Sequence, residues 1–349
     1  MKKRNNLIDI LKFVAAIMVV GIHTGPLNSF NILLNNVIFQ GVARLAVPFF
    51  FVISAYFLFS KYKKNKDIEV LYLYIKRLGK LYLFWFIVLF PVIFKIRYLW
   101  LVPELGRKGA LFAFIKELIW SSSFQGSWYL NASIVCACII FILQKKMNMK
   151  KIFIVCSCCF MFSVVVSGYY ELFSSFIGNA YEKYVYFFSE PYNTFVVGMI
   201  YFALGKYIAE TERENLWLWK VRRQALVVSV FFVVVEALCM HVFGYFRAPD
   251  CFVSLLPASY FIVINTIYFE KEIHVPERIM SFMRESSIIM YIIHFRVLDY
   301  VTNVGAKYGI FFPNTFVAYL VILLICLLIS FCILQLEKIK IFGFLKYSH

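Results

Sequence analysis

Lys12 and His23 are ionisable side chains within the apolar stretch 8–24, IDILKFVAAIMVVGIHT. They are eleven residues apart. A helix turns about 100° per residue, so both lie on one helix face, roughly 16 Å apart along its axis. Ionisable groups within a membrane span cost free energy and are often functional. A neutral imidazole can take a proton from an alcohol, which makes His23 a candidate base. The alternatives are an ordinary interfacial histidine and a lysine that anchors the span at the membrane surface.

Three further polar residues, Arg44, Glu236 and His294, also lie within or at the end of apolar runs. A guanidinium can hold a carboxylate or phosphate, or stabilise an oxyanion. Glu236 or His294 can orient a base or carry a proton. Charged groups at such depths should face a bundle interior or a watery cavity. Together with His23, these residues fit acyl transfer to a hydroxyl, and they also fit proton-coupled transport.

A basic cluster lies in the stretch YIKRLGKLYLFW, with Lys76, Arg77 and Lys80 at the expected cytoplasmic mouth of a span. Basic residues at this position attract anionic lipid. They can also hold the phosphates of a cytosolic acyl donor such as a coenzyme A thioester. The sequence leaves both interpretations open.

The composition indicates which kind of fold positions these residues. Hydrophobic residues make up 62% of the chain and charged residues 16%, and the mean hydropathy is +0.78. We therefore expect an all-α, polytopic membrane protein, because the apolar runs are continuous and do not alternate as in a β-barrel. The net charge of +17 is interpreted as loop charge that sets orientation, with no nucleic-acid partner. The nine cysteines lie mostly in apolar runs and are interpreted as packing residues, with no metal site.

Windows of about 20 apolar residues predict about ten transmembrane helices. They lie at 7–26, 42–60, 81–98, 128–144, 152–169, 191–209, 224–243, 251–268, 286–303 and 316–335. With ten spans, five Lys/Arg groups fall on one side, which places both termini in the cytoplasm. These groups are Lys2, Lys3 and Arg4 at the N-terminus, and those within 61–80, 145–151, 213–223 and 338–346. The stretch 111–124 is too short and amphipathic to span. We expect one integral-membrane domain over residues 1–349.

Several stretches resemble the membrane-bound acyltransferase-3 family of O-acyltransferases. Lys12 and His23 are similar to the family's Arg-x10-His pair, with Lys in place of Arg. The other matching stretches are RLAVPFFFVISAYF (44–57), KRLGK (76–80), WYL (128–130), YNTFVVGMIYFALG (192–205) and SSIIMYIIH (286–294). In these stretches Ala55 replaces a glycine and Lys80 replaces an arginine. Each stretch is weak alone, but their order and spacing together are fairly specific.

This resemblance implies a ten-helix bundle that takes an acyl group, usually acetyl, from cytoplasmic acyl-CoA. The resemblance also implies that the protein lies in a bacterial inner membrane. There it would transfer the acyl group to a sugar hydroxyl of an envelope polysaccharide or lipid-linked glycan. His23 would be the base or acyl relay, and Lys12 a charged partner on the donor path. Arg77 and Lys80 would contact the donor phosphates, with Lys76 beside them. Arg44 and His294 would shape the site, and Glu236 remains a candidate for proton transfer.

A second resemblance favours a different function. The membrane part of vancomycin-resistance serine racemases has a similar RxAVPFFF stretch and is thought to help import L-serine. In those proteins a cytosolic racemase domain follows the last helix, whereas this sequence stops at His349. We therefore expect such a domain to be absent or to have been removed. A transporter-like membrane protein that moves a small polar solute such as L-serine remains the alternative.

Overall fold

The computed structural model of the chain describes residues 5–121, 124–244, 248–309 and 314–349. Within these ranges the regular structure is entirely helical, with no strand. The expectation of an all-α fold is thereby confirmed. Lys2, Lys3 and Arg4, which contribute to the predicted orientation, lie outside the described residues.

The chain forms two compact units. Unit 1 comprises Met1–Phe50, Val221–Gly244 and Pro257–His349, and unit 2 comprises Phe51–Lys220 and Tyr245–Leu256. Unit 1 collects segments from both ends of the chain, so the units are not successive domains. The expectation of one domain over residues 1–349 stays a prediction.

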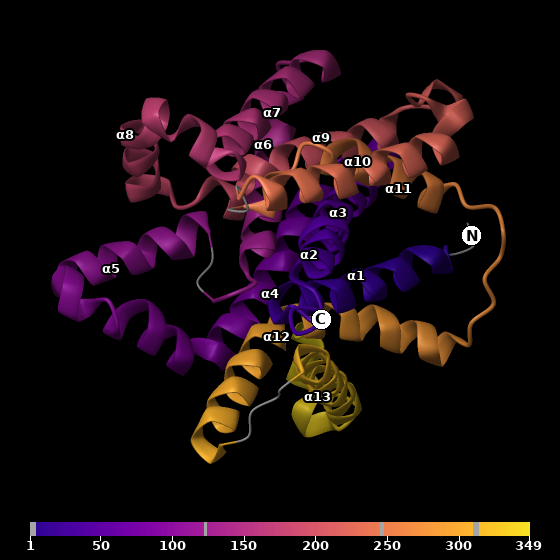
Figure 1. Cartoon of the computed structure of the whole chain (residues 1–349). Coiled ribbons are helices and arrows are strands. Elements are labelled where there is room, and N and C mark those ends of the chain that lie inside the picture. Colours follow the sequence, from indigo (N-terminus) through magenta and orange to yellow (C-terminus); the bar gives the residue numbers. More distant parts are fainter. Residues whose placement is uncertain (1–4, 122–123, 245–247, 310–313) are drawn as a thin grey trace. The chain divides into compact units, whose positions relative to one another are not determined.

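Unit 1 contains α1 (Asn6–Thr24), which carries His23, and α12 (Glu277–Tyr308), which carries His294. Its other helices are α2 (Ile32–Asn35), α10 (Arg222–Val242), most of α11 (Leu255–Ile267) and α13 (Thr315–Leu336). The last helix is followed by a 3₁₀ segment, η9 (Lys340–Tyr347). Helix α1 packs along α12, and α13 packs against both (Figure 1). Helices α1 and α12 run parallel, because Asp9 meets Arg284 and, further along both helices, His23 meets His294.

Helix α1 has defined caps at both ends. The Asn5 side chain accepts a hydrogen bond from the Leu7 amide, which satisfies one of the unpaired donors at the helix start. Gly25 adopts a left-handed conformation with φ of 58°, and its amide donates to the Gly21 carbonyl. This cap ends the helix directly after Thr24 and leaves His23 in the last turn.

Two irregular turns connect α2 to α3 (Ala46–Asn65) and place Arg44. They are a π turn, η1 (Asn36–Gly41), and a 3₁₀ turn, η2 (Val42–Leu45). Close approach on both sides of η1 requires glycine. A Cβ on Gly21 would lie 2.3 Å from the Phe39 ring, and one on Gly41 would lie 2.8 Å from the Ala237 Cβ. The turn is therefore held tightly between α1 and α10.

Unit 2 consists of most of α3 and a set of helices around α9 (Phe195–Glu210). The other helices are α4 (Glu69–Phe94), α5 (Val102–Trp120), α6 (Trp128–Leu143), α7 (Met149–Ser163) and α8 (Tyr170–Phe188). Helices α6 and α7 pack against α9, and α4 packs against α6. Gly205 allows α9 to approach α3 closely, because a Cβ there would lie 2.4 Å from the Val52 carbonyl oxygen.

Each of the ten predicted spans overlaps an observed helix, but only part of the set meets the requirements for spanning. Among the described residues, six helical stretches are long and apolar enough to cross a membrane: Asn6–Thr24, Ile32–Asn65, Glu69–Leu99, Met149–Gly168, Trp219–Val242 and Thr315–Leu336. Helices α6 and α11 are apolar but shorter. The count of ten and the position of both termini therefore stay predictions.

The predicted start of the span 81–98, which leaves the basic cluster outside the helix, was wrong. Helix α4 begins at Glu69, so Lys76, Arg77 and Lys80 lie on a helix. The physical reason is visible in the run EVLYLYIKRL, in which the buried residues Val70, Tyr74 and Leu78 recur every four positions. A continuous apolar face of this kind favours a helix despite the charges on its other sides.

Candidate functional site

The imidazole rings of His23 and His294 are stacked in unit 1. Their centroids are 5.2 Å apart and their planes differ by 25°. The ring of Phe295 packs against both, at 4.3 Å from His23 and 4.4 Å from His294. His23 is exposed, whereas His294 is only 1% exposed. One histidine of the pair is thus accessible to a reactant, and the other is fixed behind it.

The hydrogen bond of His294 determines which of its nitrogens carries a proton. Its Nδ1 lies 2.7 Å from the Tyr291 carbonyl oxygen, which can only accept, so Nδ1 is the donor. In the neutral ring Nε2 then bears the lone pair. This Nε2 is buried and makes no hydrogen bond with any described residue. A buried basic nitrogen therefore remains available beside the His23 ring.

Arg44 is tied to the end of α1 through Gln40. The Gln40 amide oxygen accepts hydrogen bonds from Nε and Nη2 of Arg44, at 3.2 and 2.5 Å. The Gln40 amide nitrogen donates to the Ile22 carbonyl oxygen at 2.8 Å. Ile22 directly precedes His23, so this chain of contacts couples the guanidinium to the helical turn that carries the exposed histidine.

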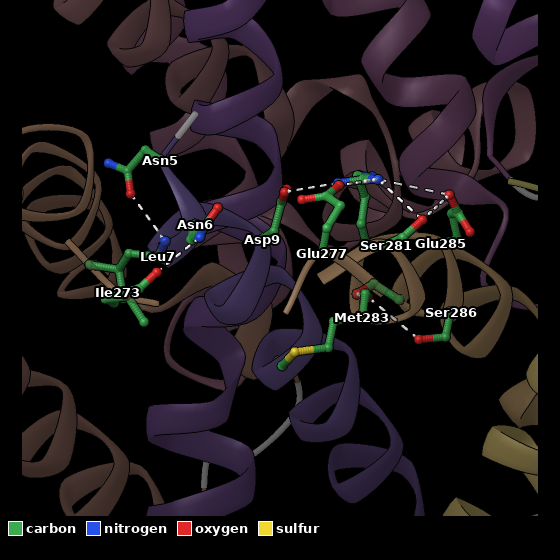
Figure 2. Close-up of polar contacts among 12 residues, drawn as sticks. Asn5, Asn6, Leu7, Asp9, Ile273, Glu277, Ser281, Met283, Glu285 and Ser286 are labelled. Carbon is green, nitrogen blue, oxygen red and sulfur yellow. Dashed lines mark hydrogen bonds and ion pairs between the residues drawn. The ribbon is translucent and has the colours of Figure 1, made fainter. Parts of the chain in front are cut away.

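An ionic network, here called the Arg284 network, lies nearer the start of α1 and α12 (Figure 2). Arg284 Nη1 is 3.4 Å from the Asp9 carboxylate, while Nη2 lies 3.7 Å from Glu277 and 3.9 Å from Glu285. Ser281 accepts from Arg284 at 3.3 Å and donates to Glu285 at 2.8 Å. The Asp9 side chain is 7% exposed. The nearly buried Asp9 carboxylate thereby pairs α1 with Arg284 of α12. It lies on the same face of α1 as His23.

Lys12 and Glu236 lie in the same unit as the histidines, but on different parts of it. Lys12 is half-buried on α1, and the intervening helix separates it from His23 by about 16 Å along the axis. Glu236 is half-buried on α10, next to Ala237, which packs on Gly41. The roles of both residues stay predictions.

The basic residues of α4 belong to unit 2. Lys76, Arg77 and Lys80 are all exposed. The Lys76 ammonium lies 5.3 Å from the centre of the Tyr72 ring, within cation–π range. Exposed cations on an otherwise apolar helix can contact anionic lipid or a soluble anion.

Three polar residues of this arrangement were missed by the sequence analysis. Gln40 lies four residues before Arg44, a spacing that could have suggested a helical contact. Asp9 lies on the same helix face as Lys12 and His23, at positions three and fourteen residues before them. Arg284 fell outside the predicted span 286–303, because α12 begins earlier, at Glu277.

The described residues include no group of three or more His, Cys, Asp or Glu side chains that could hold a metal ion. A family model described as an acyltransferase domain, Acyl_transf_3, matches residues 5–335. The chain belongs to the acyltransferase-3 family. The resemblance stated from the sequence is thereby confirmed, and its acyltransferase domain covers both units.

Two curated relatives of this acyltransferase-3 chain carry the name amino-acid racemase, and both come from Enterococcus faecalis. One is 28% identical over 259 residues, covering 72% of this chain and 34% of the relative. The other is 23% identical over 345 residues, covering 97% of this chain and 47% of the relative. The chain thus spans less than half the length of these relatives. No solved structure matches it.

Proposed function

We propose that this protein is a membrane O-acyltransferase of the bacterial inner membrane. It takes an acyl group, in the simplest case acetyl, from cytoplasmic acyl-CoA and transfers it to a hydroxyl of an envelope polysaccharide or lipid-linked glycan. Both termini lie in the cytoplasm. Membership of the acyltransferase-3 family supports this proposal. The observation that carries it is the stacked pair of one exposed and one buried histidine, with the buried Nε2 unpaired among the described residues.

His23 acts as the base in this proposal. Its imidazole takes the proton of the acceptor hydroxyl while the hydroxyl oxygen attacks the thioester carbonyl. The carbon–sulfur bond then breaks, and the coenzyme A thiolate leaves and is protonated by the imidazolium. Arg44, held by Gln40, stabilises the negative charge on the carbonyl oxygen. His294 fixes the orientation of His23, and its buried Nε2 is the second basic nitrogen of the site. Lys12 and Glu236 are the charged groups along the donor and proton paths.

The test uses purified protein in lipid vesicles with radiolabelled acetyl-CoA. His23→Ala should abolish coenzyme A release and label transfer while the protein remains folded in the membrane. His274→Ala is the matched control, because the His274 side chain is 85% exposed and lies in a loop. Wild-type activity in the His23 variant would exclude this assignment, whereas loss of activity in both variants would indicate a nonspecific effect.

A second candidate function follows from the names of the curated relatives. A membrane domain joined to an amino-acid racemase could supply the racemase with its amino-acid substrate. Import of L-serine is therefore the alternative function. The same vesicles distinguish the two functions. Accumulation of radiolabelled L-serine inside them, without any acyl turnover, would support transport and contradict the acyltransferase proposal.

A further inference from the structure

The 3₁₀ segment η9 arranges its side chains in three rows. A 3₁₀ helix has three residues per turn, so side chains three positions apart lie above one another. One row, here called the apolar stripe, consists of Ile341, Phe344 and Tyr347, which are 79%, 53% and 38% exposed. The neighbouring row, here called the basic stripe, carries Lys340 and Lys346, and both are exposed. Two of the three rows thus face outward, one apolar and one basic.

The third row faces the protein. Phe342 and Leu345 are half-buried, and Ser348, which continues this row just beyond η9, is fully buried. The His349 Nε2 lies 3.5 Å from the Glu337 carboxylate, so the residues on either side of η9 meet at its base. The Ser348 hydroxyl lies 3.1 Å from the His349 Nδ1. These contacts fix the orientation of η9 and keep the two stripes on its outer side.

The outer side of η9 carries positive charge. Residues 338–347 include three lysines and no acidic residue. The adjacent acidic residue, Glu337, is half-buried and lies against His349. The Lys346 ammonium is 5.1 Å from the centre of the Tyr347 ring, within cation–π range, so the two stripes meet there. Charge complementarity calls for an anionic partner. It disfavours a second copy of η9, which would bring the same charge.

Helix α13 places η9 at a membrane surface. The stretch Thr315–Leu336 is long and apolar enough to cross a membrane, and η9 begins four residues after its end. Isoleucine and aromatic side chains beside lysines are typical of segments that lie between the headgroups and the acyl chains. A soluble anion would neutralise the lysines but leave the apolar stripe in water. An anionic phospholipid satisfies both stripes.

We infer that η9 binds the anionic phospholipid surface of the membrane. The apolar stripe lies among the upper parts of the acyl chains, and the basic stripe contacts the headgroup phosphates. Helix α13 packs against α1 and α12, so this contact also anchors the helix that supports the histidine pair. The inference goes beyond acyl transfer and does not depend on it.

The experiment measures how lipid protects η9 from trypsin. The purified full chain is placed in lipid nanodiscs, one copy per disc, so that both membrane faces are open to the protease. The discs contain either phosphatidylcholine alone or an equal mixture of phosphatidylcholine and phosphatidylglycerol. Cleavage after Lys346 is followed by mass spectrometry. Lys145 and Lys146, exposed in the turn between α6 and α7, are the control sites.

Cleavage after Lys346 should be at least about tenfold slower in the mixed discs, because each lysine near an anionic surface favours the contact by roughly fivefold. Raised salt should remove this protection, because it screens the charges. The two control sites should be cleaved at the same rate in both kinds of disc.

One variant tests the basic stripe. Lys340→Gln retains Lys346 as a cleavage site and should reduce the protection by about fivefold. Lys307→Gln, which removes an exposed charge from α12, is the matched control and should behave as wild type.

A second variant tests the apolar stripe. Ile341→Ser combined with Phe344→Ser retains every lysine and should abolish the protection, because no apolar side chains remain to enter the bilayer. Ile154→Ser, at a position on α7 that is 63% exposed, is the matched control. Unchanged cleavage at Lys145 and Lys146 verifies that each variant is folded.

Four results would overturn the inference. Fast cleavage after Lys346 in both kinds of disc would show that η9 does not bind lipid. Slow, salt-insensitive cleavage in both would show that the contact needs no anionic lipid. Protection in phosphatidylcholine discs by added glycerol phosphate would assign the basic stripe to a soluble anion. Protection that appears only with two copies per disc would assign the surface to a second copy of the chain.

Discussion

The His294 ring lies stacked on the His23 ring while its own Nδ1 donates a hydrogen bond to the Tyr291 carbonyl. The buried histidine is thus fixed in both orientation and tautomer by its own helix. Its contact with His23 joins α12 to the last turn of α1. The two residues are separated by most of the chain, so the pair exists only because these helices pack side by side.

Replacing His294 by phenylalanine should separate its chemical role from its packing role. His294→Phe keeps an aromatic ring against His23 and Phe295 but removes the Nε2 lone pair. Acyl transfer should fall about 100-fold, a common contribution of acid–base groups, while thermal unfolding in detergent changes little. A single-turnover assay measures the effect. An unchanged rate would reduce His294 to a packing residue.

Gln40→Leu should free the Arg44 guanidinium from α1. The variant removes the acceptor for Arg44 and the donor to the Ile22 carbonyl. We expect about a tenfold lower rate of acyl transfer, because a misplaced cation stabilises the oxyanion less well. The binding of acetyl-CoA should be unaffected. Gln335→Leu, which changes an amide that binds only Lys338 in the described contacts, is the control. Equal rates in the two variants would argue against the coupling.

Asp9→Asn should destabilise unit 1 by removing the charge that faces Arg284. The expected loss is about 1.5–3 kcal/mol, since the carboxylate is nearly buried and the guanidinium is 26% exposed. Unfolding in mixed micelles measures it. A double-mutant cycle with Arg284→Gln should be strongly non-additive. Additive effects would show that the two side chains do not interact in the folded protein.

Gly41→Val should disturb the turn that carries Arg44. Its Cβ would lie 2.8 Å from the Ala237 Cβ, so α10 must shift, at a cost of about 1–3 kcal/mol. Ala237→Gly should partly restore both stability and activity. Gly79→Val is the comparison, because a Cβ at Gly79 meets nothing within 4 Å. Similar losses at both glycines would point to general helix effects and away from packing.

The sequence was sufficient for the helical class and the family, and it placed Lys12 and His23 on one helix. Hydrophobic runs identified a helix around each predicted span, and the eleven-residue spacing identified the face shared by Lys12 and His23. These features depend on local periodicity, which a single sequence contains.

The contacts between distant segments were not predictable in the same way. Gln40 lies on a π turn, whose altered geometry has no strong sequence pattern. Arg284 is in a polar part of α12 that an apolar window excludes, although the helix continues through it.

The Asp9–Arg284 and His23–His294 contacts connect the same two parallel helices at separate heights. Sliding α12 along α1 by one residue would move both pairs by about 1.5 Å. Neither contact can change its helix register alone. The Asp9–Arg284 ion pair therefore helps to set the position of the His294 ring along the helix axis relative to the His23 ring, although it lies far from the place where the rings meet.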